Sequence, residues 1–165
     1  MKTFKKIILA SIILLLTASC KKDDLPKATQ EGKNIMAAKV NGKTWIQTAC
    51  WSCINGGSGL RANYSNNILN IVGQGSSNST IELLLFVDRP SQYQSNSGFN
   101  SFEFRDYNTD EYYKTTPKTN GIVNITKIDR SKKIISGTFS FKAENEDDPN
   151  DIITVADGRF DVIYN

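Results

Sequence analysis

Cys50 and Cys53 are the residues whose type and spacing could most directly do chemistry, because only two residues separate the two thiols. A thioredoxin-type redox site uses this spacing at the start of a helix that follows a strand. Here the Gly-rich residues 56–59 follow instead, so we expect no such helix. We therefore predict a local disulfide between Cys50 and Cys53, with a redox site and free thiols as the alternatives.

The sequence contains no histidine, which removes histidine-based catalysis and histidine-ligated metal sites. Zinc at Cys50 and Cys53 would need two further ligands, and only carboxylates are available for that role. The acidic residues 144–151 could supply oxygen ligands to calcium, but they lack the alternating order of known calcium loops. We interpret this run as a solvated hairpin loop, and we predict no metal and no cofactor.

Aromatic side chains outside the core could bind a ligand, because aromatic faces line ligand sites and can stack on sugar rings. Tyr93, Phe99 and Tyr107 lie in a region rich in Ser and Asn and are candidates for exposure. Tyr112 and Tyr113 are adjacent in a predicted strand, so one of the two must face outward. These five residues are the candidate ligand-binding residues.

Paired carboxylates could serve a hydrolase, since a glycosidase needs two carboxyl groups about 5–10 Å apart in a cleft. The candidates for such a pair are Glu82, Asp88, Glu103, Asp106, Asp110 and Glu111. Nothing in the sequence selects two of them. We therefore assign no catalytic residue.

Residues 1–19 have the three parts of a secretory signal peptide: a basic start, an apolar stretch at residues 7–16 and small residues at 17–19. Ten to twelve apolar residues span about 15–18 Å as a helix, well short of a bilayer core of about 30 Å. We therefore expect this segment to be cleaved and not to act as a transmembrane anchor.

Residues 16–20 resemble a bacterial lipobox, in which the cysteine becomes the lipidated first residue of the mature protein. Thr17 occupies the usual leucine position, and Leu16 lies one residue earlier. Two or three acyl chains hold a protein stably on a membrane. We therefore expect a lipid anchor at Cys20, with ordinary cleavage after Ala18 or Ser19 as the alternative.

The charged residues 21–24 resemble the short signal that sends Bacteroidota lipoproteins to the outer face of the outer membrane. We accordingly expect surface exposure on the outer membrane, with the periplasmic face as the alternative. Residues 20–34 contain Pro26 and Gly32 among polar residues, and we interpret them as a lipidated, flexible tether. Residues 35–165 are long enough for one domain with one core.

The charge balance argues against a nucleic-acid partner. Lys2, Lys5 and Lys6 precede Cys20 and no acidic residue does, so the formal charge of +3 belongs to the signal peptide and the remainder is neutral. Nucleic-acid binding requires a strong basic excess. The expected partners are the membrane, through the lipid anchor, and a glycan or another envelope protein.

The hydrophobic pattern is that of strands, because no long window keeps a helical stripe. Asn41-Gly42 is a strong hairpin signal, Asn66-Asn67 a weaker one, and we also predict a hairpin turn at Asp157-Gly158. Near the C-terminus, Phe139, Phe141, Phe160 and Val162 should face inward, and Thr138, Ser140, Arg159 and Asp161 outward. We predict an all-β fold, an antiparallel β-sandwich of about eight to ten short strands, with a β-barrel as the alternative.

Three sequence segments together resemble one protein family. They are residues 38–45 (AKVNGKTW), 135–141 (ISGTFSF) and 154–162 (TVADGRFDV). The family consists of Bacteroidota lipoproteins known only by a domain of unknown function. The resemblance implies a β-rich envelope protein and assigns no catalytic residue. We therefore expect a non-catalytic, lipid-anchored envelope protein with a structural or partner-binding domain. The alternative is a surface glycan- or ligand-binding module, and a carboxylate-dependent hydrolase is the third reading.

Overall fold

The computed structural model describes residues 24–51, 53–54, 57–75 and 77–165, and it confirms an all-β antiparallel fold. Its eleven strands are β1 (Ile35–Val40), β2 (Lys43–Ile46), β3 (Leu60–Ser65), β4 (Ile68–Gly75), β5 (Ser79–Phe86), β6 (Gln92–Gln94), β7 (Ser101–Asp106), β8 (Glu111–Lys114), β9 (Gly121–Asp129), β10 (Ile134–Asn145) and β11 (Ile152–Ile163). Among these residues no helix is long and apolar enough to cross a membrane. The signal peptide and Cys20 lie outside the described residues.

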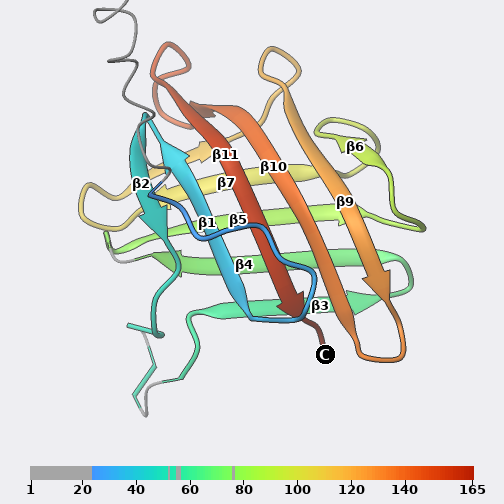
Figure 1. The fold of residues 1–165 in the computed structure, drawn as a ribbon. Helices are drawn as coiled ribbons and strands as arrows, with labels where there is room; N and C mark the ends of the chain where they lie inside the picture. The colour runs from blue at the N-terminus through green and yellow to red at the C-terminus, as the bar shows by residue number, and fades with distance from the viewer. Residues whose placement is uncertain (1–23, 52, 55–56, 76) are drawn as a thin grey trace, which may run out of the picture.

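The strands form one curled sheet with two layers that cross steeply (Figure 1). The front layer has the order β2-β1-β11-β10-β9-β6, and the back layer has the order β8-β7-β5-β4-β3. β10 joins them, because it pairs with β9 over most of its length and then pairs Glu144 and Asn145 with β8. The structure is therefore a sandwich closed like a barrel along one side.

The core fills the space between the layers, and the predicted alternation near the C-terminus is confirmed. Phe139, Phe141 and Phe160 are 4%, 3% and 2% exposed, and Val162 is fully buried. Thr138 and Ser140 point outward and are exposed. Asp161 also points away from the core. It is nevertheless 0% exposed, because residues 29–33 cover it.

Two predicted turns are confirmed and one is wrong. Asn41-Gly42 and Asn66-Asn67 connect β1 to β2 and β3 to β4, with positive φ at all four residues. Asp157-Gly158 makes no hairpin, because β11 continues through it. Asp157 has a φ of 52°, and the register shifts by one residue against both neighbouring strands, so this is a β-bulge.

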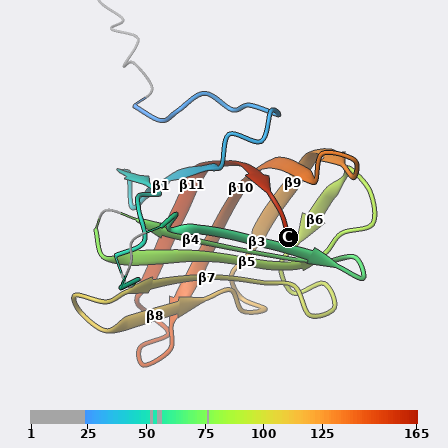
Figure 2. The same ribbon diagram turned by 90° about the horizontal axis from the view of Figure 1, so that it is seen from below.

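Residues 24–34 lie across the outer side of the front layer, which Figure 2 shows edge-on. Leu25 is only 5% exposed. The backbone N–H groups of Glu31, Gly32 and Lys33 all donate to the Asp161 carboxylate. The described part of the predicted flexible tether is therefore fixed to the sheet, a contact that its Pro- and Gly-containing composition did not predict.

Candidate binding cleft

A cleft of about 340 Å³ lies between the two layers, beside the edge strand β2. We call it the mouth cleft. Its lining residues are Val40, Asn41, Lys43, Thr44, Trp45, Ser77, Phe104, Asp106, Glu111, Tyr113 and Ile153. The aromatic members are largely buried and form an apolar floor, and the polar members come from both layers. A mostly apolar hollow with a few convergent polar groups is the usual form of a small-molecule site.

Trp45 shapes this floor because the β1–β2 hairpin directs it from the front layer toward the back layer. Its indole N–H donates to the Ser79 hydroxyl at 2.9 Å. The ring lies against Gly73 and Gly75, where an added Cβ would collide with it. The two glycines therefore leave the space that the indole ring fills.

The polar rim of the mouth cleft combines two carboxylates and an amine. Asp106 and Glu111 are direct cross-strand partners on β7 and β8, and Lys43 comes from β2. One Asp106 oxygen accepts the Asn108 backbone N–H at 2.8 Å, and one Glu111 oxygen accepts the Thr109 hydroxyl at 2.8 Å. The carboxylates thus hold the intervening turn and still offer acceptors toward the cleft.

Tyr113 closes the cleft at the side of β8. Its side chain is 4% exposed, and its hydroxyl donates to the Asp151 carboxylate at 2.7 Å. Burial, together with this hydrogen bond, raises the pKa of Tyr113 to about 12. Tyr113 is therefore a neutral part of the cleft wall at physiological pH. Tyr113 therefore lines the cleft as a buried side chain and does not offer an exposed ring face on which a ligand could stack.

The other candidate aromatics do not share one surface. The Tyr93 hydroxyl is within 2.8 Å of the Asp88 carboxylate, and its hydrogen bond lowers the pKa of Asp88. Phe99 is exposed in the loop before β7, and Tyr112 is half-buried on the outer face of the back layer. Burial, followed by a hydrogen bond to Glu103, raises the pKa of Tyr112. Neither Tyr93 nor Phe99 contributes to the mouth cleft.

Tyr107 forms an exposed aromatic pair with Trp51. Tyr107 is one of the predicted binding residues, whereas Trp51 is not. The two rings meet edge-on at 5.0 Å, and the Arg105 guanidinium lies 4.8 Å from the Tyr107 ring centre. Both rings are 41% exposed. Cys50 and Cys53, on either side of Trp51, are joined by a disulfide with a Cα–Cα distance of 5.5 Å.

The remaining carboxylate candidates are dispersed. Glu82 and Glu103 are cross-strand partners on the open outer face of the back layer. Asp88 lies beside Tyr93, and Asp110 pairs with Arg105 at 2.8 Å in the β7–β8 turn. In the part of the chain that the structure describes, no group of three or more acidic or thiol side chains is placed to hold a metal. Residues 146–151 form the β10–β11 hairpin loop.

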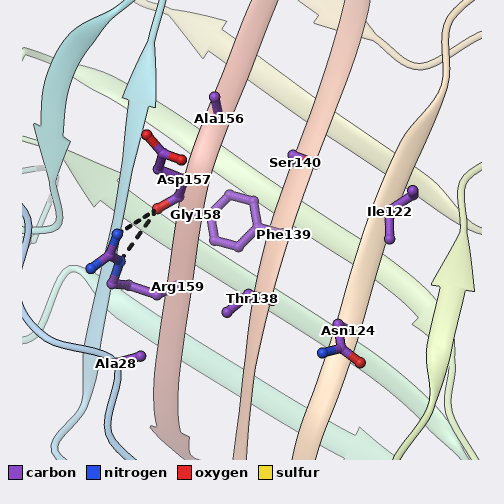
Figure 3. Close-up of a pocket in the computed structure, with 10 residues that line it drawn as sticks. All are labelled: Ala28, Ile122, Asn124, Thr138, Phe139, Ser140, Ala156, Asp157, Gly158 and Arg159. Carbon is purple, nitrogen blue, oxygen red and sulfur yellow. Dashed lines mark hydrogen bonds between the residues drawn. The ribbon is translucent and has the colours of Figure 1, made fainter.

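A second, shallow hollow of about 560 Å³ lies on the outer face of the front layer, around the bulge in β11 (Figure 3). We call it the outer trough. The Phe139 ring packs on Gly158, where any Cβ would collide with it. The Arg159 guanidinium donates to the carbonyl oxygens of Asp157 at 3.2 Å and Pro26 at 3.0 Å. The trough is therefore bounded on one side by the tether.

Asp161 binds the tether to the front layer. Its carboxylate accepts the Thr29 hydroxyl at 2.6 Å, the Ser136 hydroxyl at 2.7 Å and the N–H groups of Glu31 and Gly32 at 2.9 Å each. Burial alone would raise the pKa of Asp161, but these hydrogen bonds outweigh it and lower the pKa to about 2. The carboxylate is therefore ionised throughout the physiological range.

These features define a class: an antiparallel two-layer β-domain with an aromatic-floored cleft and a tether fixed to its outer face. The chain belongs to the family described as Domain of unknown function (DUF6252), whose profile matches residues 33–163. This match confirms the resemblance to a family without an assigned function. No curated protein and no solved structure matches the chain.

Proposed function

We propose that this chain is a non-catalytic, lipid-anchored protein of the outer membrane whose β-domain binds a small polar ligand in the mouth cleft. The observation that carries the binding role is the convergence of Lys43, Asp106 and Glu111 above a floor of buried aromatic rings. The cleft volume of about 340 Å³ lies at the low end of small-molecule sites, which are roughly 300–1,000 Å³.

The chemistry of the cleft favours a carbohydrate ring. Asp106 and Glu111 supply acceptors for hydroxyl groups, and Lys43 supplies a donor on the opposite side. An apolar floor beneath such a polar rim matches a ring that has apolar faces and hydroxyl-bearing edges. Because one oxygen of each carboxylate already holds the β7–β8 turn, we assign these side chains to binding and not to acid–base catalysis.

The anchoring part of the proposal rests on the order of charged, apolar and small residues that ends at Cys20. Intact mass and detergent partitioning of the wild type and of Cys20→Ser test it. We expect acyl mass and detergent-phase recovery for the wild type alone. Equal release of both forms into the aqueous phase would contradict lipidation. Surface exposure is the proposed location, and protease accessibility on whole cells distinguishes it from the periplasmic face.

Binding is tested by calorimetric titration of the purified full chain with hexoses, amino sugars and N-acetylated disaccharides. Glu111→Gln should weaken the binding of any sugar that the wild type binds. Glu146→Gln is the matched control, because Glu146 lies in the exposed β10–β11 loop outside the cleft. Equal affinities for both variants would place the sugar elsewhere, and no binding across the panel would reject the carbohydrate reading.

A further inference from the structure

We infer that the outer face of the front layer lies against the lipid headgroups of the membrane that holds the protein. This inference rests on the proposed lipid anchor at Cys20 and adds a docking surface to it. The face includes the outer trough and its continuation toward the β10–β11 hairpin. The occupant is a membrane surface with anionic headgroups.

The path of the tether supplies the first argument. The described part of the tether, residues 24–34, lies on the outer side of the front layer, away from the back layer (Figure 2). Contacts along its length fix it there: Arg159 donates to the Pro26 carbonyl at 3.0 Å, and the Lys127 amine donates to the Gln30 carbonyl at 2.8 Å. The buried Asp161 carboxylate holds the end that leads into β1. The point where the chain leaves the domain is therefore fixed on one face.

Chain length supplies the second argument. Cys20 precedes Asp24 by four residues, which span at most about 14 Å when fully extended. Stacked sheets are about 10 Å apart, and each also carries a layer of outward side chains. Four residues that start on the front side are too short to wrap past both layers. An anchored Cys20 therefore brings the front layer, and not the back layer, to the bilayer surface.

The charge of the outer trough and its continuation supplies the third argument. Lys118, Lys142 and Arg159 line the trough and its continuation, where Asp157 is the only carboxylate among the lining residues. Asp157 is itself 3.5 Å from the Lys39 amine. Cationic side chains near an anionic membrane surface are attracted to its headgroups.

Exposed isoleucines add apolar surface to the same face. Ile122 and Ile152 are 39% and 46% exposed on β9 and β11. A mixture of cations and apolar groups suits the headgroup region of a membrane.

Fluorescence quenching of the lipidated full chain tests the orientation. Ser140→Cys places a label on the front face, and Asn63→Cys places one on the back face; both positions are exposed on strands. Each labelled protein is reconstituted into vesicles of phosphatidylethanolamine and phosphatidylglycerol, and the neutral quencher acrylamide is added. We expect the vesicles to reduce quenching at position 140 several-fold and to leave quenching at position 63 unchanged.

Three controls keep the result decisive. Adding Cys20→Ser to Ser140→Cys removes the anchor and should restore full quenching at position 140. Equal protection at both positions, or stronger protection at position 63, would overturn the proposed orientation. Protection at position 140 already in detergent would indicate a second copy on this face and would also overturn it. Intact mass shows whether the chain is lipidated, and this separates the proposed anchor from the proposed orientation. If the chain is lipidated but position 140 is unprotected, only the orientation is rejected. A chain without lipid rejects both.

Discussion

Replacing Asp161 with alanine should detach the tether and destabilise the domain by about 3 kcal/mol. The carboxylate accepts two hydroxyl groups and three backbone N–H groups at 2.6–3.2 Å and is fully buried. Hydrogen bonds to a charged group contribute roughly 1.5–3 kcal/mol each. Release of the tether returns about 1–2 kcal/mol of backbone entropy per residue, so the net loss is a fraction of the gross sum.

Because the pKa of Asp161 is lowered, the contribution of this carboxylate to the free energy of unfolding depends on pH. The folded-state pKa of about 2 lies below the ordinary value of 3.8, so the unfolded state binds more protons between these two values. The contribution of Asp161 is therefore fully present above about pH 4 and is lost as the pH falls through about 2. The shift corresponds to a loss of about 2 kcal/mol across this window, at 1.36 kcal/mol per pKa unit.

Thermal unfolding followed by circular dichroism from pH 2 to pH 7 measures both effects. Asp161→Ala should lower the Tm by roughly 10 °C at pH 7, and its difference from the wild type should shrink as the pH approaches 2. Asp147→Ala is the matched control, an exposed aspartate in the β10–β11 loop, and should change stability by less than about 0.5 kcal/mol. A wild-type Tm for Asp161→Ala, or a difference that does not vary with pH, would refute the reasoning.

Further predictions concern the core, the cleft and the thiols. Phe141→Ala should cost about 3–5 kcal/mol in denaturant unfolding and Thr138→Ala under about 1 kcal/mol, and equal midpoints would contradict the register of β10. Gly75→Ala should destabilise the domain and change the near-ultraviolet circular dichroism of tryptophan, because a Cβ there collides with the indole of the cleft floor. Thiol counting under denaturing conditions without reductant should find Cys50 and Cys53 unreactive, and two free thiols would contradict the disulfide.

Local patterns predicted the all-β class, two hairpin turns and the buried faces near the C-terminus, because alternation and tight turns depend on neighbouring residues. Phe139 and Phe160 illustrate this, since each is buried on the side that the pattern indicates. The Asp157-Gly158 pair did not distinguish a hairpin turn from a β-bulge, because both structures use a residue with positive φ. β6 was not predicted, since three residues are too few to show a period.

The site was less predictable, because its parts come together through distant contacts. Asp161 was correctly placed away from the core side, but the groups that bury it lie about 130 residues earlier in the chain. Asp106 and Glu111 stand opposite each other because of the register between β7 and β8. The sequence pattern of the two strands does not determine that register. Trp51 could have been found as the aromatic residue between two cysteines, although Tyr107, its partner, is far away in sequence.

The position of β1 has a consequence for the order in which the chain folds. β1 pairs with β11, so that Ile35 stands opposite Asp161, and β11 also separates β1 from β10. The back layer, by contrast, is built from hairpins of adjacent strands such as β3–β4 and β4–β5. Contacts between distant residues form slowly, because their loop-closure entropy must be overcome first. The back layer can therefore form first, whereas β1 has no partner in the front layer except β2 until β11 is in place.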